Sequence, residues 1–495
     1  MAGTFNVRGA PIGWSAIAVA LLASMGGFLF GYDTGQISGI QEMADFISRF
    51  GTEPPDGSVA GATMSFNKWL IGLIVSMLSI GTAIGALLGA ILADKLGRRY
   101  AMFLEVLVFD IGVIIQVTAF QAWSNKFRYM ANSIALGIPF ATILGVGILF
   151  CPESPRWLVA NGRNDQAYRS VATVRGAKRE DSNPWVEAEY SELVSNYEQD
   201  IKLGAGSWVE CFKKPNRVLY RTMLGIALQA GQQLTGANYF FYFGATIFSS
   251  VDLQDSFVTQ IILGAVNFAC TFLGLYILER FGRRMPLVLG AAWMVIWLLV
   301  FGLAGTLGGT PDGTVTNRGI GILLIVSACM FILGYASTWA PGIWLFCGES
   351  FSRRTRAKQA SIATLSNWIW NFLIAYFSRP IADSIHFEYG FVFAGANFLN
   401  MLIAFFFVYE SADLTLEGID QLYSEPNLKA WHSGKWVPEG YANRDAIKKS
   451  EKEDDDVAHI PDDRKDGAWK AKPDPVTGEE RDTVRKHPET KVETV

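Results

Sequence analysis

The feature that most constrains this chain is a series of apolar runs, each long enough to cross a lipid bilayer. A helix needs about 20 apolar residues to cross the hydrocarbon core. Because backbone groups inside a bilayer must be satisfied within helices or closed barrels, repeated runs of this length predict an all-α, multi-pass membrane protein. Ten such runs lie at approximately 12–33, 69–93, 101–123, 132–151, 221–248, 257–278, 286–305, 319–346, 361–382 and 389–409.

The first run is expected to stay in the mature protein. It continues into Gly31-Tyr32-Asp33-Thr34 and shows no small-residue cleavage pattern, which distinguishes it from a removed signal peptide.

Basic loops indicate the orientation of the chain. The Lys- and Arg-bearing loops 94–99, 279–284 and 352–356 fall on one side of the membrane if the helices alternate, and the positive-inside rule places that side in the cytoplasm. The loop 152–220 and both termini then lie inside the cell, with the loop 34–68 outside. The expected location is the plasma membrane. Only the basic patch 126–128 falls on the outer side.

Cysteine and histidine positions exclude several function classes. The five cysteines are isolated, and the four histidines lie outside the apolar runs. This pattern contains neither a disulfide framework nor the spacing of a metal site. No nucleophile and base pair is visible either, so we expect no enzyme activity, no metal, no cofactor and no nucleic-acid partner.

One loop sequence occurs twice. Residues 89–99 read G-A-I-L-A-D-K-L-G-R-R, and residues 275–284 read L-Y-I-L-E-R-F-G-R-R. In each copy an acid, Asp94 or Glu279, is followed by a turn with glycine and then two arginines. We interpret these charges as locks between helix ends, made by charge-assisted hydrogen bonds in one conformation. The arginines are Arg98, Arg99, Arg283 and Arg284.

The repeat also reveals an asymmetry. Four apolar runs follow its second copy, but only two follow the first before the charged loop 152–220. If the halves are structural repeats of six helices, the first half lacks a pair, with a junction expected near 123–132. The predicted domains are an incomplete N-terminal bundle 1–151, a cytoplasmic loop with short helices 152–220, a six-helix bundle 221–410, and a cytoplasmic, largely disordered tail 411–495 whose partners are unknown.

Amide side chains gather in the fifth run. Gln232, Thr235 and Asn238 recur at helical spacing on one predicted face, accompanied by Gln229 and Gln233. Polar residues inside a membrane usually face a cavity or a partner, and amides both donate to and accept from the hydroxyl groups of a neutral polyol. The alternative is that these amides only join helices.

Other runs add residues of the same chemistry. Asn367 and Asn371 are one turn apart in the ninth run, Asn267 lies in the sixth, and Trp344 follows Pro341-Gly342 in the eighth. Aromatic faces pack on the C–H surfaces of sugar rings, and Pro-Gly allows a helix to bend around a ligand.

Asp33 ends the first run. A carboxylate at membrane depth could take up a proton during transport, or it could be a structural residue at a helix end. The residues alone leave both open.

With these residues in view, the chain resembles the sugar porter family of the major facilitator superfamily, and most closely its fungal hexose transporters. The motifs that carry the resemblance are G-Y-D-T-G at 31–35, D-K-L-G-R-R at 94–99, P-E-S-P-R-W-L at 152–158, Q-Q-L-T-G-A-N at 232–238, E-R-F-G-R-R at 279–284 and G-E-S-F-S-R-R-T-R-A-K at 348–358.

The resemblance implies a monosaccharide bound midway across the bilayer. The matching positions are Gln232, Gln233, Asn238, Asn267, Trp344, Asn367 and Asn371. It also implies that Glu153 and Glu349 pair with the loop arginines in one gate state, with Arg356 among the gate charges, and that Asp33 occupies the position that takes up protons in symporters.

The departure from the family is a missing segment. Family helices 4 and 5 have no counterpart here, which leaves a major facilitator fold of about ten helices, four plus six, instead of twelve. The lost helices would carry a glutamine that contacts sugar, the arginine expected to partner Asp33, and the cations expected to face Glu153.

The leading functional hypothesis is therefore transport of a hexose such as glucose by alternating access, either facilitated or proton-coupled. The alternatives are a non-transporting sugar receptor, and a shortened, inactive isoform or misread gene.

Overall fold

The structure is a computed structural model of the chain. It describes residues 4–7, 10–41, 68–121, 135–177, 183–204, 207–214, 217–249, 256–310, 315, 317–352, 354–414, 416–438 and 444. Much of the predicted loop 34–68 and the predicted junction near 123–132 therefore lie outside the described residues.

Helices make up nearly all of the described chain. The N-terminal half holds β1 Thr4–Val7, β2 Ala10–Gly13, α1 Trp14–Gln41, α3 Lys68–Leu96, α4 Arg98–Gln121 and α6 Gly137–Leu149. The connecting segment holds α7 Pro155–Ala160, α8 Asn164–Arg175, α9 Pro184–Leu203 and the 3-10 helix η2 Trp208–Phe212.

The C-terminal half holds α10 Val218–Leu234, α11 Ala237–Ser249, α12 Ser256–Phe281, α13 Arg284–Gly308, α14 Arg318–Gly334, the π-helix η4 Tyr335–Trp339, α15 Ala340–Ser350, α16 Arg356–Ile385, the 3-10 turn η5 His386–Glu388 and α17 Tyr389–Phe407. After it come α18 Leu416–Ser424 and the 3-10 helix η6 Ala430–Lys435.

All ten predicted apolar runs coincide with helices in the described part of the chain, which confirms the all-α membrane class. Seven helical segments there are long and apolar enough to cross a membrane, and the longest of them contains both α16 and α17. The run 132–151 yields only the short α6, and the run 221–248 splits into α10 and α11. The antiparallel hairpin of β1 and β2, with Thr4 opposite Gly13, was not predicted.

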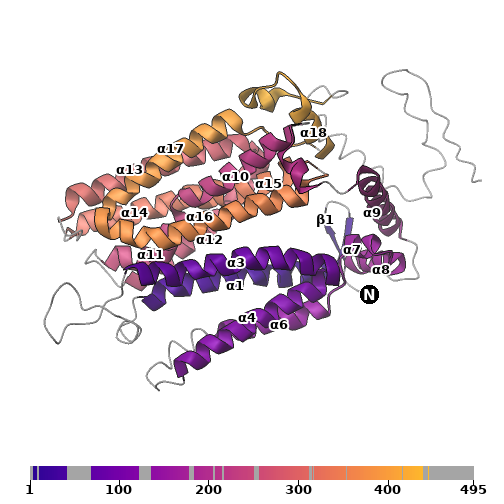
Figure 1. Cartoon of the computed structure of the whole chain (residues 1–495), viewed down its shortest axis with the longest axis horizontal. Helices are drawn as coiled ribbons and strands as arrows, with labels where there is room; N and C mark the ends of the chain where they lie inside the picture. Colours follow the sequence, from indigo (N-terminus) through magenta and orange to yellow (C-terminus); the bar gives the residue numbers. More distant parts are fainter. Residues whose placement is uncertain are drawn as a thin grey trace, which may run out of the picture.

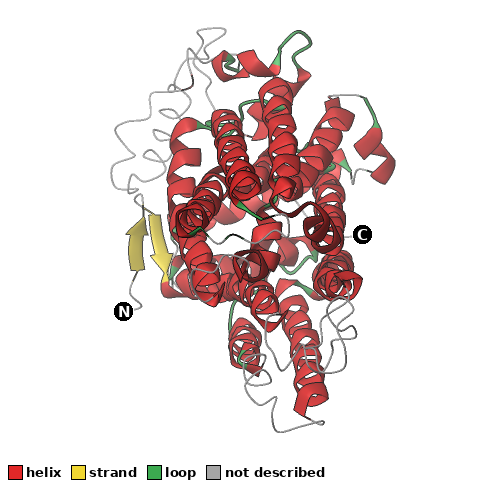
Figure 2. Cartoon of the chain, turned by 90° about the vertical axis from the view of Figure 1, so that its left-hand side faces the viewer, coloured by secondary structure: helices red, strands yellow, loops and turns green. Residues whose placement is uncertain are grey.

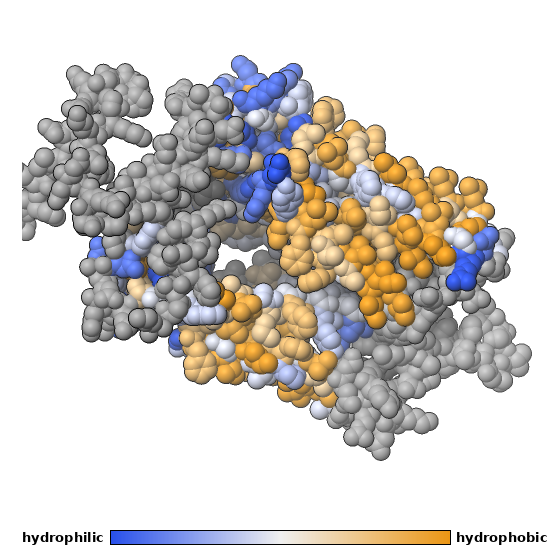
Figure 3. Space-filling view, turned by 180° about the vertical axis from the view of Figure 1, so that it is seen from behind, coloured by the Kyte–Doolittle hydropathy of each residue, from blue (hydrophilic) through white to orange (hydrophobic). Residues whose placement is uncertain are grey.

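The main apolar core lies in the C-terminal half. Its buried cluster includes Leu298, Phe301, Phe331 and Trp339, and it extends to Val75 of α3. In Figure 1, α1 and α3 run beside the C-terminal helices, and α4 and α6 lie farther out as a pair. The space-filling view shows a surface that is mostly apolar along the helices, as contact with lipid requires (Figure 3).

Charged segments gather at one end of the helices. The turns at Gly97 and Gly282, the helices α7 to α9 and α18 all lie there (Figure 1). We call it the basic end, because both Gly-Arg-Arg turns are part of it. Figure 2 looks from the opposite end, with many helices seen nearly end-on.

The prediction of a largely disordered tail is wrong for its first part. The helices α18 and η6 pack against the basic end through a buried cluster that includes Tyr409, Leu422 and Tyr423. The reason is apolar spacing: Ile419, Leu422 and Tyr423 share one face of α18, so this part of the tail can form a core. The acidic stretch 451–456 and all later residues lie outside the described residues.

Candidate functional site

A break between α10 and α11 positions the polar residues of the fifth run. Gly236 has a φ of +92°, and a Cβ atom there would lie 2.7 Å from the ring of Phe393. Glycine adopts this left-handed backbone without steric cost, so the helix stops and restarts at this point. The prediction that Gln232, Thr235 and Asn238 share one continuous helix face is therefore wrong, because the break falls among them.

Asn367 of α16 is the centre of a buried group of amides. Its Nδ2 donates to Oε1 of Gln229 at 2.7 Å and to Oε1 of Gln232 at 2.9 Å. Its Oδ1 accepts from Nε2 of Gln233 at 2.9 Å. The side chain of Asn367 is thus fully engaged by three glutamines from the last turns of α10.

Gln233 extends the group toward α11 and the next turn of α16. Its Oε1 accepts from Nδ2 of Asn371 at 3.2 Å and from Nδ2 of Asn238. We call the resulting cluster the amide network. Its members are Gln229, Gln232, Gln233, Asn238, Asn367 and Asn371.

Two residues outside the predicted site complete the network. Ser79 of α3 donates to Oδ1 of Asn371 at 2.6 Å, and the hydroxyl of Tyr242 donates to the same oxygen at 3.1 Å. The Ser79 bond joins α3 of the first half to α16 of the second. The available signal was a serine within an apolar run, which by itself is too common to indicate a site.

A widened turn in the eighth run holds Gln232 in place. Proline at 341 has no N–H to continue the α-helical ladder, and the preceding residues form the π-helix η4. The Nε2 of Gln232 donates to the carbonyl oxygens of Trp339 at 3.0 Å and Ala340 at 3.1 Å. Gln232 is thus bonded to the backbone where η4 passes into α15.

Two residues carried over from the resemblance do not join the network. Asn267 is half-buried on α12, and Trp344 on α15 is 45% exposed. Neither side chain makes a hydrogen bond within the described part. The structure therefore brings together five of the seven predicted sugar contacts and leaves these two apart.

A small cavity lies toward the basic end from the amide network, and no member of the network lines it. Its volume is about 180 Å³, and it lies between α3, which supplies Ala83 and Ala86, and α16, which supplies Thr364, Leu365 and Trp368. Its mixed lining of methyl groups, two hydroxyls and an indole suits a small polar molecule with apolar faces.

The contacts between the halves concentrate away from the basic end. Trp69, at the start of α3, packs on Tyr376 and Phe377 of α16. A Cβ on Gly72 would lie 2.4 Å from the carbonyl oxygen of Tyr376. Close backbone approach of this kind is how small residues allow membrane helices to pack.

The charged turns use their acids differently from the prediction. Glu153 accepts hydrogen bonds from the backbone N–H groups of Arg98 at 2.9 Å and Arg99 at 3.2 Å, at the start of α4. A carboxylate there satisfies unpaired donors and interacts favourably with the helix dipole. The guanidinium of Arg98 pairs instead with Asp94 at 3.2 Å, on the surface.

The second half repeats this arrangement with a residue that was not predicted. Glu410 accepts from the backbone N–H groups of Arg283 at 2.8 Å and Arg284 at 3.0 Å, at the start of α13. Gly97 and Gly282 both have positive φ and both lie against the capping carboxylate. The sequence signal was present, since Glu-Ser follows the last helix of each half within four residues.

One predicted pair of gate residues, Arg283 and Glu349, is present in the structure. Arg283 donates two hydrogen bonds from Nε and Nη2 to Glu349, the closest at 2.8 Å, which is the pairing that the resemblance implied. Burial lowers the pKa of Arg283, but the hydrogen bond and charge of Glu349 raise it more, so the net pKa lies above its ordinary value.

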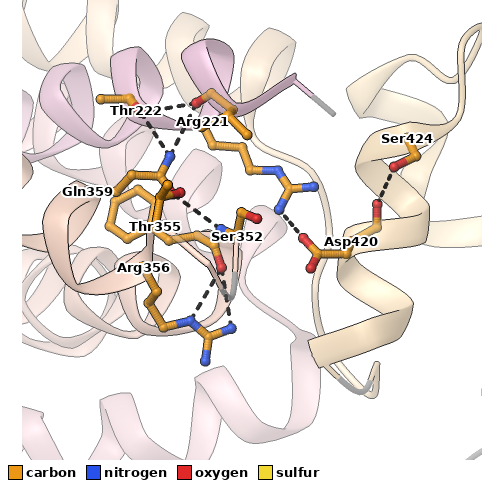
Figure 4. Close-up of polar contacts among 10 residues, drawn as sticks. Arg221, Thr222, Ser352, Thr355, Arg356, Gln359, Asp420 and Ser424 are labelled. Atoms are coloured by element: carbon orange, nitrogen blue, oxygen red, sulfur yellow. Dashed lines mark hydrogen bonds and ion pairs between the residues drawn. The ribbon is translucent and has the colours of Figure 1, made fainter. Parts of the chain in front are cut away.

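The other three gate residues are Arg284, Arg356 and Glu279. The Arg284 guanidinium donates to the carbonyl oxygen of Phe405, and that of Arg356 to the carbonyl oxygen of Phe351 (Figure 4). Within the described ranges Glu279 forms no salt bridge. Among the described residues, Arg284 and Glu279 therefore do not form the predicted acid–arginine locks.

Asp33 accepts a hydrogen bond from Nε2 of Gln36 at 2.8 Å. No lysine or arginine in the described part of the chain pairs with it.

Comparison with known proteins decides the family. A family model described as "Sugar (and other) transporter" matches residues 19–129 and 124–423. The chain belongs to this family.

Curated relatives of this sugar transporter are named as transporters of hexoses. It is 36% identical to "Hexose transporter 2" of Kluyveromyces lactis, with 88% of each chain covered. It is 35% identical to "High-affinity fructose transporter ght6" of Schizosaccharomyces pombe, with 88% of this chain and 91% of the relative covered.

A solved structure shares the fold. The inward-open xylose transporter XylE of Escherichia coli superposes with a TM-score of 0.63 at 19% identity, covering 82% of this chain and 99% of that one. The major facilitator fold is thereby confirmed.

The comparisons also support the missing segment. The match to the family restarts at residue 124, within the predicted junction. The alignment with the Kluyveromyces lactis relative is 503 residues long, although this chain has 495 residues and only 88% of them are aligned. The relative therefore has residues with no counterpart here.

Proposed function

We propose that this sugar transporter carries a hexose across the plasma membrane by alternating access and binds it at the amide network. The observation that carries the proposal is the convergence of six amides, five of them buried, at the break between α10 and α11. A sugar hydroxyl can exchange one amide–amide hydrogen bond for an amide–hydroxyl bond, so binding leaves few polar groups unpaired. The names of the relatives support a hexose as the substrate.

The proposed site also includes Asn267 and Trp344, which enter from the resemblance. We place the basic end and both termini in the cytoplasm, following the positive-inside rule. Since the halves touch away from the basic end, this arrangement is inward-facing. Figure 3 supports it, with an opening between the halves on the side of the basic end.

Uptake of labelled glucose in cells without their own hexose carriers tests the proposal. The chain should give saturable uptake that glucose and fructose compete for. Surface labelling of the same cells provides the control for delivery to the membrane. A chain that reaches the surface and binds glucose but gives no uptake would contradict transport and favour a sugar receptor.

Asp33 is our candidate for proton coupling. Its carboxylate has an amide partner and no cationic one among the described residues, so a proton can bind without breaking a salt bridge. Asp33→Asn should abolish accumulation of sugar against a gradient while leaving exchange of sugar at equilibrium intact. Uptake by the unaltered chain that never exceeds equilibrium would instead identify a facilitator.

A further inference from the structure

A second cavity lies at the basic end, away from the amide network. Its volume is about 580 Å³, and its walls come from the end of α3, the start of α4, the turn between α7 and α8, and α8 itself. Because α3 and α4 end there, the cavity lies at the level where membrane lipids carry their headgroups. Its lining includes two of the predicted gate residues, Arg99 and Glu153, but no proposed transport step places a ligand in it.

Four cations line this cavity. They are Lys95, Arg99, Arg163 and Arg169, and they come from four separate segments of the chain. The positive-inside rule accounts for basic residues on this face of the membrane. It does not account for their convergence on one cavity.

The lining includes one acid, which is already engaged. The carboxylate of Glu153 accepts from the backbone N–H groups of Arg98, Arg99 and Ser154. In the described ranges no salt bridge involves any of the four cations. The Nε of Arg99 is buried and has no hydrogen-bond partner there. The cavity therefore has a surplus of positive charge and an unused donor.

Aromatic residues hold the wall in shape. Trp157 donates from Nε1 to the carbonyl oxygen of Asp94 at 2.8 Å, which fixes α7 to the end of α3. The guanidinium of Arg163 lies over the Trp157 ring, 5.5 Å from its centroid. Arg163 is thus directed by a fixed indole, while its N–H groups stay available.

From this geometry we propose that the cavity binds a ligand bearing phosphate groups. A phosphate monoester carries a charge of about −1.5 to −2 and three acceptor oxygens. Arginine forks bind phosphate oxygens two at a time. One or two phosphate groups would neutralise the surplus positive charge of the cavity. A single carboxylate would not. The source is either the headgroup of a phosphoinositide in the inner leaflet or a soluble phosphate ester.

Binding to the purified full chain in nanodiscs tests the proposal. One arm uses discs with and without phosphatidylinositol 4,5-bisphosphate and counts retained lipid by native mass spectrometry. The other uses lipid-neutral discs and labelled inositol 1,4,5-trisphosphate. Retention of the lipid with weak binding of the soluble probe identifies a headgroup site, and equally tight binding of the soluble probe identifies a free phosphate ester. Either result supports the proposal.

Charge-removing variants locate the site. Arg163→Gln and Arg169→Gln, both at exposed side chains, should each weaken binding about fivefold. Arg156→Gln is the matched control, because Arg156 is exposed on α7 and is not part of the cavity lining. The proposal fails if neither probe binds, if both cavity variants keep full affinity, or if the control weakens binding as much as they do.

Discussion

At the scale of single residues, the amide network bears on two roles that the sequence left open, joining helices and the proposed binding of sugar. Its members do join helices, since Asn367 of α16 bonds to Gln229 and Gln232 of α10. The same groups are suited to sugar hydroxyls, because every bond in the network can be replaced by an equivalent one. Joining helices and binding substrate are therefore not alternatives here.

Asn367→Ala should separate the two roles. It removes three amide partners at once and should weaken glucose binding about tenfold or more. Asn397→Ala is the matched control: Asn397 is a buried amide that donates to the backbone of Thr235 and Phe393. The control should lower the melting temperature more than the glucose affinity. Glucose-dependent thermal stabilisation measures both, and equal affinity losses in the two variants would argue against the assigned site.

Gly236→Ala should destabilise the protein by about 2 kcal/mol or more. A side chain there must adopt a positive φ and must also displace the Phe393 ring. Gly395→Ala on α17 is the control, because nothing lies within 4 Å of its added Cβ. Thermal unfolding of the purified variants compares them, and similar melting temperatures would contradict the described break.

At the scale of elements, a carboxylate caps the first helix after each repeated turn. Glu410→Gln should cost about 1 kcal/mol, since it removes a charge that the start of α13 favours. Glu425→Gln, an exposed change in the same region, should have little effect. Urea unfolding provides the measurement, and an equal effect of both changes would show that the cap is unimportant.

The helix α18 is attached through a buried charge. Arg221 is fully buried and pairs with Asp420 (Figure 4). Asp420→Ala should cost about 2 kcal/mol, less than for a fully buried pair because Asp420 is one-third exposed. Adding Arg221→Leu should restore much of the melting temperature, since no unpaired charge then remains. A double variant as unstable as the single one would contradict this explanation.

The sequence predicted elements well where length and polarity decide them. The ten helical runs follow from the thickness of the bilayer, and the amides stand out because polar groups are costly there. The break at Gly236 was not predictable, because membrane helices tolerate glycine and the sign of φ cannot be read from it. Ser79 was missed for a similar reason: Ser76, one turn earlier, merely bonds its own backbone at Leu73.

The first part of the tail was missed because charge dominates the composition of the tail as a whole. The charged stretch 451–456 suggested a largely disordered tail, although Ile419, Leu422 and Tyr423 have the spacing of a packed helix.

At the scale of the whole molecule, the two halves differ in how much core they hold. The second half and α3 share one large cluster, whereas the buried cluster of α1, α4 and α6 contains only Leu29, Val106, Ala141 and Leu144 among the described residues. On α4, which lies farther out with α6, the side chain of Val108 is 68% exposed. The proposed sugar site depends mainly on the second half, so a chain short of two helices can keep the amide network intact.

Glucose counterflow into proteoliposomes holding the purified chain tests the central claim most directly. We predict saturable counterflow that Asn367→Ala abolishes and Asn397→Ala retains in proportion to the protein that stays folded. Glucose-dependent thermal stabilisation of the same preparation reports whether the site is formed. One result would contradict the claim that the ten-helix chain transports: glucose stabilises the chain but gives no counterflow, and counterflow appears only when two helices are inserted between Trp123 and Leu136.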